Sequence, residues 1–176
     1  MMKRRMEELK MVYRVLQFAH ALFPKINSKD IQWAVKQLSS EASTLFLQQS
    51  LPDQRHAIDV AQSIIKARYS LSIEDFENLV TASLLHDCGK SVISLRLWHR
   101  VFIVLIQKTP QTLRSCLENG HSIFSYPLKI DKRHALWGGY LAEQAGLNPN
   151  ICRLIREHHN PKTDLGRLLE QADNNH

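Results

Sequence analysis

Histidine stands out in this chain, both in number and in position. There are nine histidines among 176 residues. Several lie where the apolar stripe of an expected helix reaches its edge or its end, and one aspartate near the C-terminus is placed in the same way. A helical bundle that turns imidazoles and carboxylates inward must neutralise them, and a metal ion does so efficiently. The residues concerned are His56, His86, His134, His158 with His159 beside it, and Asp173.

The most specific local pattern is the segment LLHDCGK, in which His86 and Asp87 are adjacent and Lys90 follows. The segment DQRH precedes it, and a single histidine, the segment REHH and the pair Ala-Asp follow it in that order. This ordered set, over about residues 52–173, resembles the HD superfamily, which contains metal-dependent phosphohydrolases. The HDxGK and HH elements look most like the branch that includes the HD-GYP cyclic-dinucleotide phosphodiesterases. However, NPKT stands where a Gly-Tyr-Pro loop is expected, which argues against hydrolysis of cyclic di-GMP. A closer likeness is to short stand-alone HD hydrolases, some of which cleave nucleotides or diadenosine tetraphosphate.

The resemblance implies a role for each polar residue of the set. His56, His86, Asp87 and Asp173 would hold a first metal, and Asp87 would bridge to a second metal held by His134 and His158. The bridging role agrees with the donor chemistry, because a carboxylate offers two oxygens whereas an imidazole nitrogen binds one cation. The expected cofactors are two divalent transition-metal ions, from among Fe, Mn, Ni, Co and Zn, which would activate a metal-bound hydroxide. Asp87 and Lys90 are the expected catalytic residues.

Three residues are candidates for binding the substrate. Lys90 could hold a phosphate oxygen as a point charge, although a cation is also favoured at a helix C-terminus for structural reasons. Arg55 could clamp the substrate or lie on an exposed surface. His158 falls close to the centre of the apolar arc of its helix, and His159 is displaced from it. We therefore expect His158 to point into the site and His159 to lie at its rim, as a substrate contact or outer-shell donor.

The elements that must position these residues are all expected to be helices. Hydrophobic periodicity and capping residues predict helices over about 4–22, 29–38, 40–50, from Pro52 onward, from Ser72 to Gly89, 94–107, 131–146, from Pro149 to Asn160, and 163–174. The stretch 108–130 contains Pro110, Gly120 and Pro127 and is expected to be a flexible cover or a loop with short helices. These patterns predict an all-α fold, and the resemblance implies an HD-domain helical bundle with extra N-terminal helices. Residues 1–51 would form an extension packed on a metal-binding core of residues 52–176.

Composition indicates which partners and which cellular compartment to expect. The net charge of +6 and the pI near 9.4 favour an anionic partner, expected to be a phosphorylated small molecule or nucleotide, although a solvated basic helix face explains much of the excess. No motif indicates sequence-specific nucleic-acid binding, and a weak homo-oligomer is left open. The three cysteines lack CxxC spacing, which favours a reducing, cytoplasmic compartment. The apolar run 95–106 is too short to span a membrane, so we expect a buried helix there, with an interfacial helix as the alternative.

The expected function is hydrolysis of a phosphomonoester or phosphodiester bond, in a nucleotide, by a metal-dependent enzyme. Two alternatives belong to other classes. One is a binding or signalling module that keeps the fold and turns nothing over. The other is a di-iron oxygenase, since related HD folds use such a site for oxygen chemistry. Lys90 and the basic balance of the chain favour phosphate chemistry.

Overall fold

The computed structural model describes residues 26–67, 69–92, 99, 102–103, 106, 109–120 and 122–176. Within those ranges every regular element is a helix and no strand occurs, so the predicted all-α class is confirmed. The expected helix over 4–22 and most of the expected helix over 94–107 lie outside the described residues. The elements in chain order are α2 (Ser28–Lys36), α3 (Ser40–Gln48), α4 (Leu51–Ala67), α5 (Ile73–Leu85), the short 3-10 helix η1 (Cys88–Val92), α7 (Gln111–Glu118), α8 (Ser122–Gln144), α9 (Pro149–Glu157) and α10 (Asp164–Asn174).

Helix starts follow from capping side chains that the sequence supplies. At each of five N-termini a side-chain oxygen accepts a hydrogen bond from a backbone N–H two or three residues later, which satisfies a donor that the helix itself leaves unpaired. These capping residues are Asn27, Ser39, Ser72, Asn148 and Thr163. Such caps fix the starts of α5 and α9 close to their expected positions.

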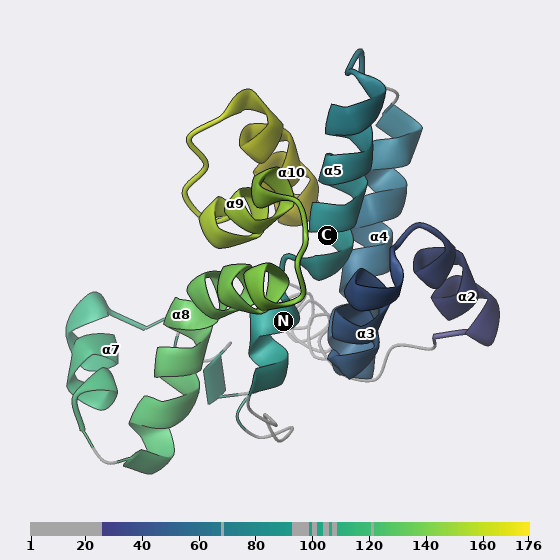
Figure 1. Ribbon diagram of the computed structural model, residues 1–176. Helices are drawn as coiled ribbons and strands as arrows, with labels where there is room; N and C mark the ends of the chain where they lie inside the picture. The colour runs from purple at the N-terminus through teal and green to yellow at the C-terminus, as the bar shows by residue number, and fades with distance from the viewer. Residues whose placement is uncertain are drawn as a thin grey trace, which may run out of the picture.

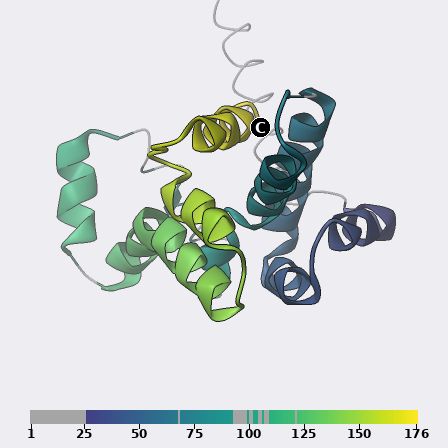
Figure 2. The ribbon, with the colours of Figure 1, turned by 45° about the horizontal axis from the view of Figure 1, so that its top comes forward.

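The main hydrophobic core joins helices from both ends of the chain. Figure 1 and Figure 2 both show α4 and α5 side by side, with α9 and α10 next to α5 and with α7 apart, beyond the far end of α8. Helices α2 and α3 contribute to this core through Ala34 and Phe46, which are fully buried. The largest side chains of the cluster come from several helices: Phe46, Ile58, Ile64, Leu79, Leu84, Leu85, Ile155 and Leu169.

The stretch 108–130 is more regular than the sequence predicts. It contains α7, and α8 already begins at Ser122 rather than near 131, with Pro127 inside the helix. Proline has no N–H, so Pro127 cannot donate the helical hydrogen bond to the carbonyl of Ile123. Ile123 lies near the start of α8, and its side chain is exposed. Burial of Leu128 and Ile130 then favours the helix against this loss. The expectation of an irregular stretch is therefore wrong for these residues.

Two glycines act differently from each other. Gly146 has φ of 71° and ends α8 in the left-handed conformation typical of a helix C-terminus. Gly89 has no positive φ but lies so close to α8 that an added Cβ would come within 1.9 Å of the His134 carbonyl oxygen. The glycine of the HDCGK segment is thus required by close packing of η1 on α8.

Among the described residues, no helix is both long and apolar enough to cross a bilayer.

Candidate metal centre

The polar residues singled out in the sequence come from five parts of the fold. His56 lies on α4, His134 on α8 and Asp173 near the end of α10. His86 and His158 are the C-cap residues of α5 and α9, and Asp87 directly follows the first of them. Four of these side chains are almost wholly inaccessible to solvent: His86, Asp87, His134 and His158. The fold therefore brings buried polar groups from the ends of α5 and α9 together with one from within α8.

One triplet of donors joins α4, the end of α5 and α10. The Nε2 atom of His56 lies 2.8 Å from Oδ1 of Asp173, and Nε2 of His86 lies 3.4 Å from the same oxygen. Ligand atoms of all three residues lie within 4.8 Å of one another. This separation is small enough for a single metal ion to contact all three.

A second triplet joins α8 with the end of α9. Nε2 of His134 lies 3.3 Å from Nε2 of His158 and 3.0 Å from Nε2 of His159. Here too the ligand atoms of the three residues fall within 4.8 Å of one another. His159 is exposed, yet its ring nitrogen is part of this cluster and could serve as a third donor.

Asp87 lies between the two triplets. Its Oδ1 is 3.2 Å from Nε2 of His134, whereas its Oδ2 is 3.7 Å from Nε2 of His86. Each oxygen thus faces one cluster, which is the arrangement that a bridging carboxylate needs. Oδ2 also accepts a hydrogen bond of 2.6 Å from Nζ of Lys90, whose side chain is one-quarter exposed.

Backbone carbonyls fix the orientation of the three buried imidazoles. In each case Nδ1–H donates to the carbonyl oxygen three residues earlier in the chain: Ser83 for His86 at 2.8 Å, Asp131 for His134 at 2.6 Å and Ile155 for His158 at 2.7 Å. A neutral imidazole with its proton on Nδ1 presents a lone pair at Nε2, which is the form that binds a metal. The sequence reasoning missed these carbonyls. The only signal for them is their position three residues before each histidine.

The donor set fits a metal ion. Nε2 of His86 is fully buried and, within the described residues, makes no hydrogen bond. Nε2 of His134 and Nε2 of His158 face each other while both rings already donate through Nδ1, so two neutral rings cannot hydrogen-bond to each other there. A cation between these nitrogens removes the conflict, and unpaired buried polar atoms are otherwise costly.

The electrostatics keep the carboxylates charged and one histidine neutral. Burial alone would raise the pKa of Asp87, but the charges of Lys90 and His86 outweigh it and hold this pKa well below its usual range. Burial likewise acts to raise the pKa of Asp173, yet the hydrogen bond with His56 and the nearby imidazole of His86 keep this pKa low. Burial, together with the charge of His86, lowers the pKa of His158 to about 3. Both carboxylates and His158 are therefore in ligand form at neutral pH.

The pKa values of a buried histidine and a partly buried lysine are shifted in the opposite direction. Burial would lower the pKa of His86, but the nearby carboxylates Asp87 and Asp173 outweigh it and raise this pKa. The pKa of Lys90 is also raised, because Asp87 and Asp53 outweigh the effect of its burial. Without a metal, Lys90 and His86 thus supply the positive charge that balances the carboxylates.

The remaining residues of the motif segments have structural partners. Arg55 donates to Asp30 at 2.9 Å and forms a second ion pair with Asp59 on its own helix. Burial raises the pKa of the Cys88 thiol to about 12, and its Sγ lies 3.7 Å from the carbonyl oxygen of Gly138. Cys88 therefore stays protonated and is a packing residue beside α8.

Comparison with known proteins agrees with this all-helical fold and its buried histidine and aspartate cluster. The family model of the HD domain matches residues 54–176 of this chain, so the chain belongs to the HD-domain family. The resemblance noted in the sequence is thereby confirmed at the level of the family. Neither the curated proteins nor the solved structures gave a significant match.

Proposed function

We propose that this protein is a metal-dependent phosphohydrolase that cleaves a phosphomonoester or phosphodiester bond of a nucleotide. The observation that carries the proposal is the pair of donor triplets with Asp87 between them. Membership of a family that consists largely of phosphohydrolases supports the same reading. The division of the chain into an N-terminal extension of residues 1–51 and a metal-binding core of residues 52–176 remains a prediction.

The chain's own residues would divide the work as follows. His56, His86 and Asp173 would hold one metal ion, His134 and His158 a second, and Asp87 would bridge the two through its separate oxygens. Bound ions of this kind acidify water and withdraw charge from a phosphoryl group. His159, at the exposed side of the second triplet, would complete that site or contact the substrate. The carbonyls behind the buried rings would hold Nε2 of each histidine toward the centre.

Lys90 would be suited to bind the substrate if its ion-pair partner, Asp87, binds metal instead. Its ammonium group is the counter-ion of Asp87 Oδ2 in the structure. If Asp87 serves as a metal ligand, the added positive charge beside Lys90 would weaken this ion pair. The ammonium group would then be able to bind a phosphate oxygen. Arg55 is less suited to this role, because both Asp30 and Asp59 already engage it.

Phosphate release from a nucleotide panel tests the proposal. The full-length protein, with the metal it carries on purification, is compared with Asp87→Asn and with a matched control, Asp164→Asn. Asp164 is an exposed carboxylate paired with Arg167 on α10. We expect hydrolysis by wild type and by the control. The Asp87 variant should lose more than about 100-fold, beyond the loss typical of an outer-shell change.

Equal activity in the Asp87 variant and in wild type would contradict the proposed centre. Metal-loaded protein that releases no phosphate but consumes oxygen would instead favour the oxygenase alternative. Metal-loaded protein that does neither would favour a binding module.

A further inference from the structure

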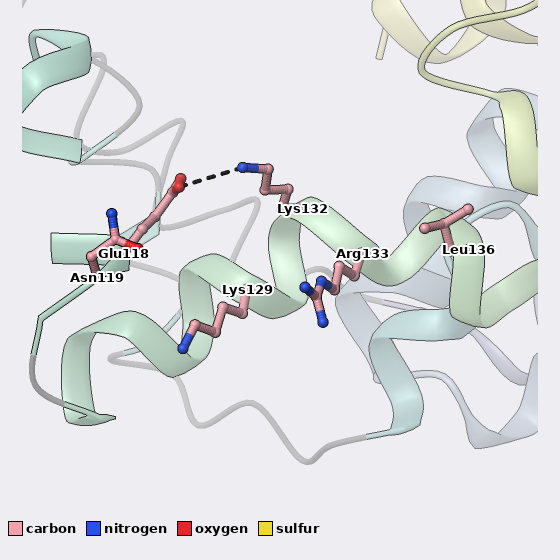
Figure 3. A pocket seen from close by; sticks show the side chains of 6 residues that line it. All are labelled: Glu118, Asn119, Lys129, Lys132, Arg133 and Leu136. Carbon is pink, nitrogen blue, oxygen red and sulfur yellow. Dashed lines mark ion pairs between the residues drawn. The ribbon is translucent and has the colours of Figure 1, made fainter. Parts of the chain in front are cut away.

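A cavity borders α8, away from the buried histidines. It has a volume of about 330 Å³ and, among the described residues, is lined by Glu118 and Asn119 at the end of α7 and by Lys129, Lys132, Arg133 and Leu136 of α8. Figure 3 shows side chains from both helices bordering this space, with the ion pair between Lys132 and Glu118 across it. The volume is at the lower end of the range for small-molecule sites.

The cavity is distinct from the candidate metal centre. At 100° per residue, Lys129, Arg133 and Leu136 share one face of α8, and His134 points about 130° away from the centre of that face. The burial of these residues agrees, since His134 is inaccessible whereas Lys129, Arg133 and Leu136 are exposed. A ligand in this cavity would therefore be held on the opposite side of α8 from the metal ligands.

The charges of the cavity favour an anion. Three of its residues are cations and one is a carboxylate. The carboxylate of Glu118 is already engaged, by Arg114 at 3.2 Å as well as by Lys132 at 3.5 Å. Across the part of the chain that the structure describes, neither Lys129 nor Arg133 has an acidic partner. These two cations stand one helical turn apart on one face and repel each other. An anionic group between them would remove that repulsion.

The rest of the cavity lining adds two further features. Glu118 and the side-chain amide of Asn119 offer oxygens that accept hydrogen bonds from a hydroxyl or amino group. Leu136 is 56% exposed and provides an apolar surface beside the cations. A simple inorganic anion would use neither feature, and the carboxylate would repel the continuous backbone of a nucleic acid.

We propose that this cavity binds a nucleoside phosphate at a site separate from the metal centre. The phosphates would lie between Lys129 and Arg133, the ring would contact Leu136, and a ligand hydroxyl would donate to Glu118. The proposal goes beyond the proposed hydrolase activity and does not depend on it, because none of these residues belongs to the metal centre.

Calorimetric titration with adenosine diphosphate tests this site. The full-length Asp87→Asn variant serves as the background, so that loss of the metal centre is separated from loss of the cavity. In that background we expect adenosine diphosphate to bind. Adding Lys129→Gln with Arg133→Gln should weaken binding by at least about 10-fold, the effect of losing a charged hydrogen bond. Lys36→Gln with Lys66→Gln, which removes the same charge from α2 and α4, should leave binding unchanged. Leu136→Ala should weaken binding of the nucleotide and leave that of pyrophosphate unaltered.

Several results would overturn the inference. One is the absence of binding in the Asp87→Asn background together with binding to wild type, which would place the nucleotide at the metal centre alone. Another is equal weakening by the Lys36/Lys66 control, which would indicate general charge attraction. Equal affinity for pyrophosphate and nucleotide would refute the nucleoside part. Tighter binding of a single-stranded oligonucleotide, lost in the Lys129/Arg133 variant, would assign the cavity to a nucleic acid instead.

Discussion

Three buried histidines in this protein share one local arrangement. Each donates its Nδ1–H to the carbonyl three residues earlier, so each turns its Nε2 toward the centre of the bundle. The same bond type recurs at the ends of α5 and α9 and within α8. Imidazoles held in this way can present a deprotonated Nε2 to a cation without reorientation.

At the residue scale, Lys90 gives the sharpest prediction. Lys90→Met keeps most of the side-chain length and removes the charge. If Lys90 binds a phosphate oxygen, kcat/KM for a phosphorylated substrate should fall about 10- to 100-fold, the worth of one charged hydrogen bond. Metal content should stay unchanged, because Lys90 donates no ligand. Steady-state kinetics and elemental analysis on the same preparation check both. A change confined to thermal stability would mean that Lys90 serves only as the counter-ion of Asp87.

The sequence was informative about which residues gather, and less so about their orientation. The spacing of His86, Asp87, His134 and His158 on helix faces predicts a common site, and the structure brings these side chains together. Ring orientation depends on side-chain torsions and on nearby carbonyls, which leave no pattern in residue identity. The position of His159 shows the difference, since a displaced and exposed residue still reaches His134.

At the scale of elements, the packing of η1 on α8 links the HDCGK segment to His134. An added Cβ at Gly89 would meet the backbone of His134 and Gly138 at 1.9 and 2.6 Å. Backbone atoms cannot move aside as a flexible side chain can, so η1 and α8 would have to separate. The distance between Asp87 and His134 therefore depends on this glycine.

Gly89→Ala should consequently lower both stability and metal content. We expect a destabilisation of about 1–3 kcal/mol from overpacking, measured by urea denaturation. Gly146→Ala is the matched control, with a cost of about 1–2 kcal/mol from its left-handed conformation and no nearby atom to clash. The control should keep its metal. Full metal content in Gly89→Ala would show that the approach of η1 to α8 does not position Asp87.

Capping residues made several helices predictable, whereas α8 was mispredicted at its start. Ser72 and Asn148 indicate the starts of α5 and α9 because their side chains accept hydrogen bonds from backbone N–H groups two or three residues later. Pro127 carries a local signal against helix, and only tertiary burial of Leu128 and Ile130 outweighs it. Local chemistry is visible in the sequence, but a balance between local and long-range terms is not.

For the whole molecule, burial of uncharged histidine predicts acid sensitivity after metal removal. The pKa of His158 is lowered to about 3, so the unfolded chain binds a proton at this residue below pH 6.5 and the folded chain does not. Stability should fall as pH decreases from 6.5 toward 4, by about 1.4 kcal/mol per pH unit for this one proton. The pKa of His86 is raised, so its contribution to the free energy of unfolding is present below pH 6.5 and is lost as the pH rises above that value. The lowered pKa values of Asp87 and Asp173 matter only below about pH 3.8.

Urea denaturation of the chelator-treated protein between pH 4.5 and 6.5 checks this expectation. The His158→Gln variant should show a shallower dependence on pH over the same range, whatever its absolute stability. Identical slopes in the two proteins would mean that His158 does not carry the effect.

The most direct test of the central claim is the metal content of the whole chain as purified, measured by elemental mass spectrometry beside the Asp87→Asn variant. Two donor triplets joined by one carboxylate predict about two transition-metal ions per chain in wild type, and a marked loss when that carboxylate is replaced by an amide. Wild-type protein without bound transition metal, after purification free of chelators and supplementation with Mn, Fe, Co, Ni or Zn, would contradict the account. An unchanged metal count in the Asp87→Asn variant would contradict the bridging position of Asp87.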